Sequence, residues 1–160
     1  MNLTLLLLPL VCACSASREG PSLEVHRAAS SSCPIPAYIG DAGAAKNALG
    51  DALEKCPSPQ RTGFYRTGYC STGPEDTGAH VVCARVTDPF LRYSLAQGND
   101  LVTPRDGFSG LTAGDAWCLC ASRWSEAVSA GVAPPVVLEA TDESALRYVE
   151  RSALEAHRAP

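Results

Sequence analysis

One local pattern, an extended segment followed by a helix, occurs three times in the chain and limits the fold more than any other feature. In "HVVCARVTDPFLRYSLAQGN" apolar and polar side chains alternate as in a strand, and Asp88, Pro89 and Gly98 then supply the cap, first turn and end of a helix. "AWCLCASRWSEAVSAG" repeats this order, with Gly131 at the end of the helix. "VVLEATDESALRY" gives it a third time, with Thr141 as the helix cap. Strands that alternate with helices predict a single small α/β domain with a partly parallel sheet.

The N-terminal part of the chain differs in composition from the rest. The apolar run Leu3–Ala13 is too short for a membrane span of about 20 residues and is typical of a signal peptide. The stretch behind it is rich in Ser, Ala, Gly and Pro without periodicity, which is typical of a disordered linker or of a second targeting segment. We therefore expect a signal peptide at residues 1–16, a disordered linker or second targeting segment at 17–45, and the folded domain at 46–160. The expected location is the secretory pathway or an organelle reached through it.

The charge pattern argues against one class of partner. The chain carries a net charge of −4 at pH 7, and its arginines are scattered, with no basic run interleaved with aromatic residues. Nucleic-acid binding therefore has little support, and no segment is long enough for a stable membrane span. A site for a small-molecule or anionic ligand, built from one or two arginines, stays open.

Three residues occupy the same place in the repeated pattern, just before each crossover. They are Cys83 in "VVCA", Cys120 in "CLCA" and Glu139 in "VLEA". Ligands of open parallel sheets bind beyond the carboxyl ends of the strands, so these side chains would meet at one rim if the strands are neighbours. The alternative is a coincidence of short patterns. The predicted catalytic site has a reactive thiol (Cys120 or Cys83), a base (His80), an orienter or acid (Glu139) and an anion contact at a helix start (Arg123).

The thiols of Cys118 and Cys120 admit other interpretations. On a strand their Cα atoms lie about 6.5–7 Å apart, the outer limit for a disulfide, so we expect no bridge between them. Two thiols on one face could instead share a metal, and a zinc set would comprise Cys118, Cys120, Cys83 and His80. Burial as small apolar side chains is the commonest role of free cysteine. A zinc-stabilised or thiol-packed module that binds a partner without catalysis is therefore the alternative function.

Other chemically active residues have ordinary interpretations. Glu75 and Asp76 lie in the turn-rich segment "TGPEDTG", where a solvated loop explains them equally well. Trp117 and Trp124 are expected in the core rather than as a platform for a ligand.

Six longer stretches of the chain resemble one known family. They are "NALG", "TGFYRTGYCSTGPEDTGAHVVCARVTDPFL", "GNDLVTP", "GDAWCLCASRW", "AGVAPPVVLEAT" and "ESAL". Together they resemble a mainly bacterial family of small proteins, domain-of-unknown-function family number 2237, over about residues 47–157. The family pattern falls on Cys56, Cys70, His80, Cys83, Trp117, Cys118, Cys120, Arg123, Trp124 and Glu139. The resemblance implies a shared domain and brings no activity with it.

The chain also departs from the family pattern. The family usually reads T-H-E-S-A-L where this chain has "TDESAL", so Asp142 replaces a typical histidine. Asp142 would then be the ligand-binding residue at this place, acting as an oxygen ligand or a base. Thr67 stands where the family usually has aspartate, and "TPRDGFSGL" is shorter than the usual loop.

Overall fold

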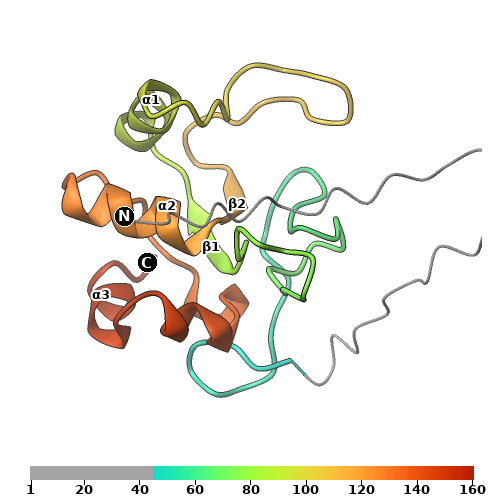
Figure 1. Ribbon diagram of the computed structural model, residues 1–160, viewed down its shortest axis with the longest axis vertical. Helices are drawn as coiled ribbons and strands as arrows, with labels where there is room; N and C mark the ends of the chain where they lie inside the picture. Colours follow the sequence, from blue (N-terminus) through green and yellow to red (C-terminus); the bar gives the residue numbers. More distant parts are fainter. Residues whose placement is uncertain (1–44) are drawn as a thin grey trace, which may run out of the picture. The chain divides into compact units, whose positions relative to one another are not determined.

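The computed structural model describes residues 45–160 (Figure 1). The expected signal peptide and nearly all of the expected linker lie outside the described residues. The described part contains strands β1 (Val82–Arg85) and β2 (Ala116–Leu119), α-helices α1 (Asp88–Ala96), α2 (Ala121–Ser129) and α3 (Arg151–Ala156), and the 3₁₀ helices η1 (Leu138–Ala140) and η2 (Glu143–Arg147). None of the helices in residues 45–160 has the length and apolarity needed to cross a bilayer.

The domain is mixed α/β, but its sheet is not partly parallel as predicted. Strands β1 and β2 form a two-stranded antiparallel ribbon in which Cys83 lies opposite Cys118. The expected third strand, "VVLEA", mostly forms η1 instead, and only an isolated bridge joins Val136 to Ala84. Two prolines, Pro134 and Pro135, precede Val136, and proline has no N–H to donate to a ladder, so pairing with β1 stays limited to this bridge.

The helices and the ribbon contribute apolar side chains to one core cluster. The fully buried core includes Phe90 of α1, Trp124 of α2 and Leu154 of α3, and the indole N–H of Trp124 donates to the carbonyl of Pro134 at 3.1 Å. Trp124 is therefore a core residue, as expected, and its polar atom is satisfied.

Two helix caps differ from the prediction by one residue. The hydroxyl of Thr87, not Asp88, accepts from the backbone N–H of Phe90 and caps α1. Asp142, not Thr141, caps η2. Threonine and aspartate are both good helix caps, so the residue type alone does not decide between two neighbours.

Two disulfides join the ribbon to the segment that precedes it. Cys56 is bonded to Cys83 and Cys70 to Cys118, with Cα atoms 5.7 and 5.2 Å apart. The sulfur atoms of Cys56, Cys70 and Cys83 all lie within 4.8 Å of one another, so the two disulfides are neighbours. Cys120 is the free cysteine of residues 45–160.

Two buried threonines complete the hydrogen bonding at the centre of the ribbon. The N–H of Cys118 donates to Thr62 Oγ1 at 2.9 Å, and the N–H of Cys83 donates to Thr141 Oγ1 at 3.1 Å. Both N–H groups thus point away from the partner strand, which makes Cys83 and Cys118 a non-hydrogen-bonded pair with closely spaced side chains. This spacing brings the two disulfides side by side.

Replacing Thr62 with valine should destabilise the domain, because the shape is kept while the buried N–H of Cys118 loses its acceptor. We expect a loss of about 1–3 kcal/mol in the free energy of unfolding, measured by urea denaturation. Thr77→Val is the matched control, since Thr77 is exposed and its hydroxyl has no partner among residues 45–160. Equal midpoints for the two variants would contradict this account.

Candidate functional site

The free thiol of Cys120 lies at one end of a chain of three side chains. Its Sγ is 3.2 Å from Nε2 of His80. The other ring nitrogen of His80, Nδ1, is 2.6 Å from Oδ1 of Asp76. The second carboxylate oxygen of Asp76 accepts from the backbone N–H of His80 at 2.8 Å and from the hydroxyl of Thr72 at 3.1 Å. A nucleophile, a base and an orienting carboxylate are therefore in hydrogen-bonding sequence.

The turn "GPEDTGAH" positions the histidine and the carboxylate. Backbone bonds from Asp76 N to Gly73 O and from Ala79 N to Asp76 O fold the turn onto itself. Ala79, next to His80, has a φ of 46°, which non-glycine residues rarely adopt. Its carbonyl accepts from the N–H of Ala121 at 3.0 Å, in the first turn of α2. The histidine loop is thus bonded directly to the segment that carries Cys120.

Cys120 is the N-cap residue of α2 and makes no side-chain capping bond. Among residues 45–160, the N–H groups of Ser122 and Arg123 in the first turn have no hydrogen-bond acceptor. Such N–H groups carry the positive end of the helix dipole. The thiol is half-buried, so it combines a polar neighbourhood with access to solvent.

Two neighbours restrict where the imidazole can lie. The ring of Phe64 stacks on His80 with centroids 5.8 Å apart. A Cβ on Gly78 would lie 2.9 Å from His80 Cε1 and 3.2 Å from the sulfur of Cys120. Only glycine at position 78 therefore lets the imidazole of His80 and the sulfur of Cys120 lie this close to the backbone of the turn.

The pKa of His80 is raised from 6.5 to about 9. The hydrogen bond to Cys120 is the largest cause, and burial opposes it by lowering the pKa. The hydrogen bond to Asp76 and the charges of both partners raise the pKa further. At neutral pH the ring is therefore an imidazolium.

Of the residues predicted for the catalytic site, only His80 and Cys120 come together. Cys83 is in a disulfide and cannot be the reactive thiol. Glu139 is paired with Arg158, and Arg123 with Glu126 at 3.0 Å. The predicted common rim of Cys83, Cys120 and Glu139 required parallel strands, and it is wrong because β1 and β2 are antiparallel and end at opposite ends of the ribbon.

Two further predicted roles have structural explanations. Asp142 accepts from the N–H and hydroxyl of Ser144 at 2.9 and 2.6 Å, so its carboxylate is occupied by capping. The zinc set cannot form because Cys83 and Cys118 are in disulfides, whereas zinc binds cysteine as a thiolate.

Asp76 is the site residue that the sequence reasoning did not select. Its side chain is fully buried, not solvated. The spacing of four residues to His80 was visible in "DTGAH", but outside a helix such spacing does not by itself bring two side chains together.

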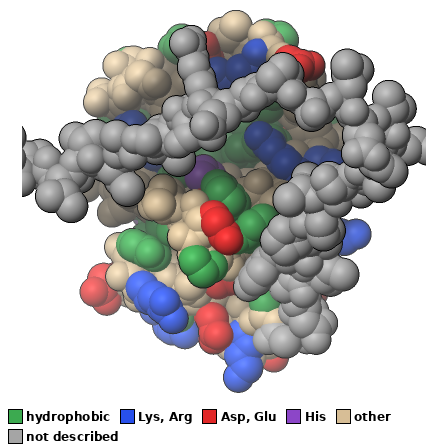
Figure 2. Space-filling model, turned by 45° about the vertical axis from the view of Figure 1, so that its right-hand side comes forward, with side chains coloured by type: hydrophobic (Ala, Val, Ile, Leu, Met, Phe, Trp, Pro, Cys, Tyr) green, Lys and Arg blue, Asp and Glu red, His purple; other side chains and the backbone are tan. Residues whose placement is uncertain are grey.

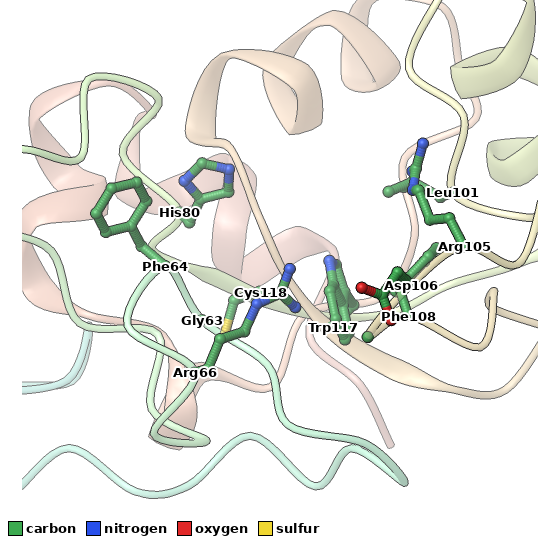
Figure 3. A pocket seen from close by; sticks show the side chains of 11 residues that line it. Gly63, Phe64, Arg66, His80, Leu101, Arg105, Asp106, Phe108, Trp117 and Cys118 are labelled. Carbon is green, nitrogen blue, oxygen red and sulfur yellow. The ribbon is translucent and has the colours of Figure 1, made fainter.

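A cavity of about 440 Å³ lies beside this site. Figure 3 shows His80 and Phe64 at one end, Arg105 and Phe108 at the other, and Arg66 between them. Figure 2 shows a histidine on the same face of the molecule as several basic side chains. The cavity thus connects the imidazole with a positively charged wall.

Fold and site together define a disulfide-bonded α/β domain with a Cys–His–Asp arrangement. A family model described as "Uncharacterized protein conserved in bacteria (DUF2237)" matches residues 46–158, and the chain belongs to this family. A search of curated proteins found no match to the chain.

The titration of His80 tests the arrangement. By NMR we expect an imidazole pKa of about 9 in the full chain, a large drop in Cys120→Ser and a smaller drop in Asp76→Asn, following the order of the causes. Because the folded pKa is raised, the stability gained from this interaction is fully present below the unfolded pKa of about 6.5 and is lost as the pH rises through about 9. A wild-type ring that titrates near 6.5 would refute the hydrogen bonds.

Gly78→Ala should disturb the site without an unfavourable backbone angle, since Gly78 is not among the glycines with positive φ. The added methyl would push the imidazole away from Cys120. We expect the His80 pKa to fall towards its ordinary value while the far-UV circular dichroism stays that of the wild type. An unchanged His80 titration would mean that the ring does not lie against Gly78.

Proposed function

We propose that the protein is a thiol-dependent enzyme of the acyl-transfer or hydrolytic class. Cys120 is the nucleophile, His80 is the general acid and base, and Asp76 orients the imidazole. The supporting observation is the continuous chain of contacts from the sulfur through both ring nitrogens to a buried carboxylate. Triads are recognised by such geometry and roles and not by sequence order.

The chemistry begins with an ion pair between the Cys120 thiolate and the His80 imidazolium, which the raised pKa of His80 supports. The sulfur attacks the carbonyl carbon of an acyl substrate, and the carbonyl electron pair moves to oxygen. When the bond to the leaving group breaks, that group takes the proton from Nε2 of His80. The products are a thioester on Cys120 and a neutral imidazole.

Water or another acceptor completes the reaction. His80 removes a proton from the acceptor as it attacks the thioester, and the sulfur leaves as a thiolate. The imidazolium–thiolate pair is thereby restored. With water the net reaction is hydrolysis, and with an alcohol, amine or thiol it is transfer.

The start of α2 is suited to stabilising the oxyanion. The N–H groups of Ser122 and Arg123 lie in the turn that follows Cys120, without acceptors among the described residues. Backbone donors of this kind supply a large part of the stabilisation in acyl-transfer enzymes. The same donors favour the thiolate before substrate binds.

A thiol-packed binding module is the competing function. Four of the five described cysteines are buried in disulfides, which suits a purely structural role. Cys120 differs from them because it is half-buried and faces a charged imidazole. A cysteine that only fills space needs no such partners.

We also propose that the protein works in an oxidising compartment reached through the secretory pathway. Disulfides persist in such compartments and are rare where thiols are kept reduced. The apolar run at Leu3–Ala13 agrees with this route.

Alkylation kinetics test the proposed thiol. With iodoacetamide at pH 7, we expect one cysteine of residues 45–160, Cys120, to react at least about tenfold faster than free cysteine, because the His80 imidazolium beside it and the start of α2 favour a nucleophilic sulfur. His80→Ala should slow the reaction about tenfold or more, and Cys120→Ser should abolish it. Labelled peptides identified by mass spectrometry provide the measurement.

Two carboxylate variants give a matched control. Asp76→Asn should slow alkylation, whereas Glu75→Gln, one position away, should not, because Glu75 accepts a hydrogen bond from Tyr65 and does not contact the imidazole.

Incubation with p-nitrophenyl acetate should add an acetyl group to Cys120 in the wild type. Ordinary thiol reactivity together with no acyl adduct would overturn the proposed function.

A further inference from the structure

We infer that the cavity beside His80 selects acyl substrates that carry an anionic group next to a flat hydrocarbon portion, with Arg66 and Arg105 as the anion contacts. This inference deepens the proposed function and rests on it for the acyl group. The inference fixes the orientation of the substrate in the cavity. The reacting carbonyl lies at the His80 end, and the anionic group lies farther along, near the arginines (Figure 3).

The charges along the cavity favour an anion. The lining contains three positive groups, Arg66, Arg105 and the His80 imidazolium, and one carboxylate, that of Asp106. The cavity is therefore positive although the whole chain carries a net charge of −4. Among residues 45–160 no carboxylate lies within ion-pair distance of Arg66 or Arg105, and the charge of Asp100 acts on Arg105 only from farther away. A positive wall in a negative protein raises the local concentration of anions.

Arg66 is held in place with most of its hydrogen-bonding groups unused. Its guanidinium carbon lies 5.2 Å from the ring centroid of Trp117, and Nη1 donates to the carbonyl of Arg61 at 3.3 Å. A guanidinium has five N–H donors, so several stay open for a planar anion. Arg66 also has a φ of 56°, an unfavourable backbone angle that is more common at functional sites than elsewhere.

Arg105 is fixed by a tight hairpin. It exchanges backbone bonds with Phe108 at 2.8 and 2.9 Å around the turn Asp106–Gly107. The guanidinium carbon lies 5.2 Å from the ring centroid of Phe108, and Nη2 donates to the carbonyl of Asp100. The remaining donors of this guanidinium are available to an anion, as in Arg66.

The rings beneath the arginines account for the flat portion of the substrate. Phe108 and Trp117 line the cavity with their ring centroids 5.3 Å apart, Trp117 beneath Arg66 and Phe108 beneath Arg105. Aromatic rings that line a cavity offer a flat hydrocarbon group offset-stacked or edge-to-face contacts, and the guanidinium groups over these rings attract its anion. A benzoate-like group satisfies both requirements.

Binding of benzoate tests the inference, with benzamide as its uncharged counterpart. The wild-type full chain is used, because neither probe is an activated acyl donor and Cys120→Ser would lower the pKa of His80. The indole N–H shift of Trp117 reports occupancy by NMR. We expect benzoate to bind at least about tenfold more tightly than benzamide. Arg66→Ala and Arg105→Ala should each weaken benzoate at least about fivefold without changing benzamide binding.

Arg147→Ala is the matched control, because Arg147 is exposed and does not line this cavity; benzoate binding should not change. Equal affinity for the two probes, or no effect of the Arg66 and Arg105 variants, would overturn the inference even if Cys120 is reactive. The proposed function fails separately: benzoate binding as expected, with a Cys120 of ordinary reactivity and no acyl adduct, leaves an anion-binding site without catalysis.

Discussion

The two neighbouring disulfides at the Cys83–Cys118 pair hold the rest of the structure together. They close chain separations of 27 and 48 residues, and cross-links of this length contribute about 3–4 kcal/mol each. A domain of this size has a total stability of about 5–15 kcal/mol. With a two-stranded ribbon and short helices as its regular elements, the domain depends on these links more than a larger sheet would.

The candidate site depends on the same links. The segment from Cys56 to His80 contains no helix or regular strand, yet it carries the carboxylate and imidazole of the site. Cys70–Cys118 fixes its middle on β2, and Thr62 adds a buried bond to the same strand. The disulfide and the hydrogen bond each restrict the conformations of this loop, and they thereby help to fix the positions of Asp76 and His80.

The sequence predicted most of what is local and little of what is long-range. The β1–α1 and β2–α2 units and the ends of α1 and α2 follow from alternation, caps and glycines over a few residues each. The pairing of Cys56 with Cys83 and of Cys70 with Cys118 joins distant positions, and spacing alone does not determine connectivity.

The site shows the same limit. Cys120 and His80 were selected by position, but their real connection runs through the turn that carries Asp76, which the repeated strand–helix pattern does not reveal. The prediction for Glu139 and Cys83 assumed parallel strands, but β1 pairs antiparallel with β2, and Val136 bridges Ala84 in the antiparallel direction. For these two residues the error therefore came from the predicted strand direction.

The strand geometry also explains how Cys120 keeps a free thiol beside two disulfides. An odd cysteine among paired ones is exposed to exchange, in which a thiolate attacks a disulfide sulfur. Cys118 is two residues away along an extended backbone, and a bridge between the two would need Cα atoms closer than the roughly 6.5–7 Å that such a backbone gives. The Cys120 sulfur is meanwhile bonded to Nε2 of His80. The imidazole thus holds the sulfur in place, and the contact that would activate the thiol in the proposed function also keeps it from the disulfides.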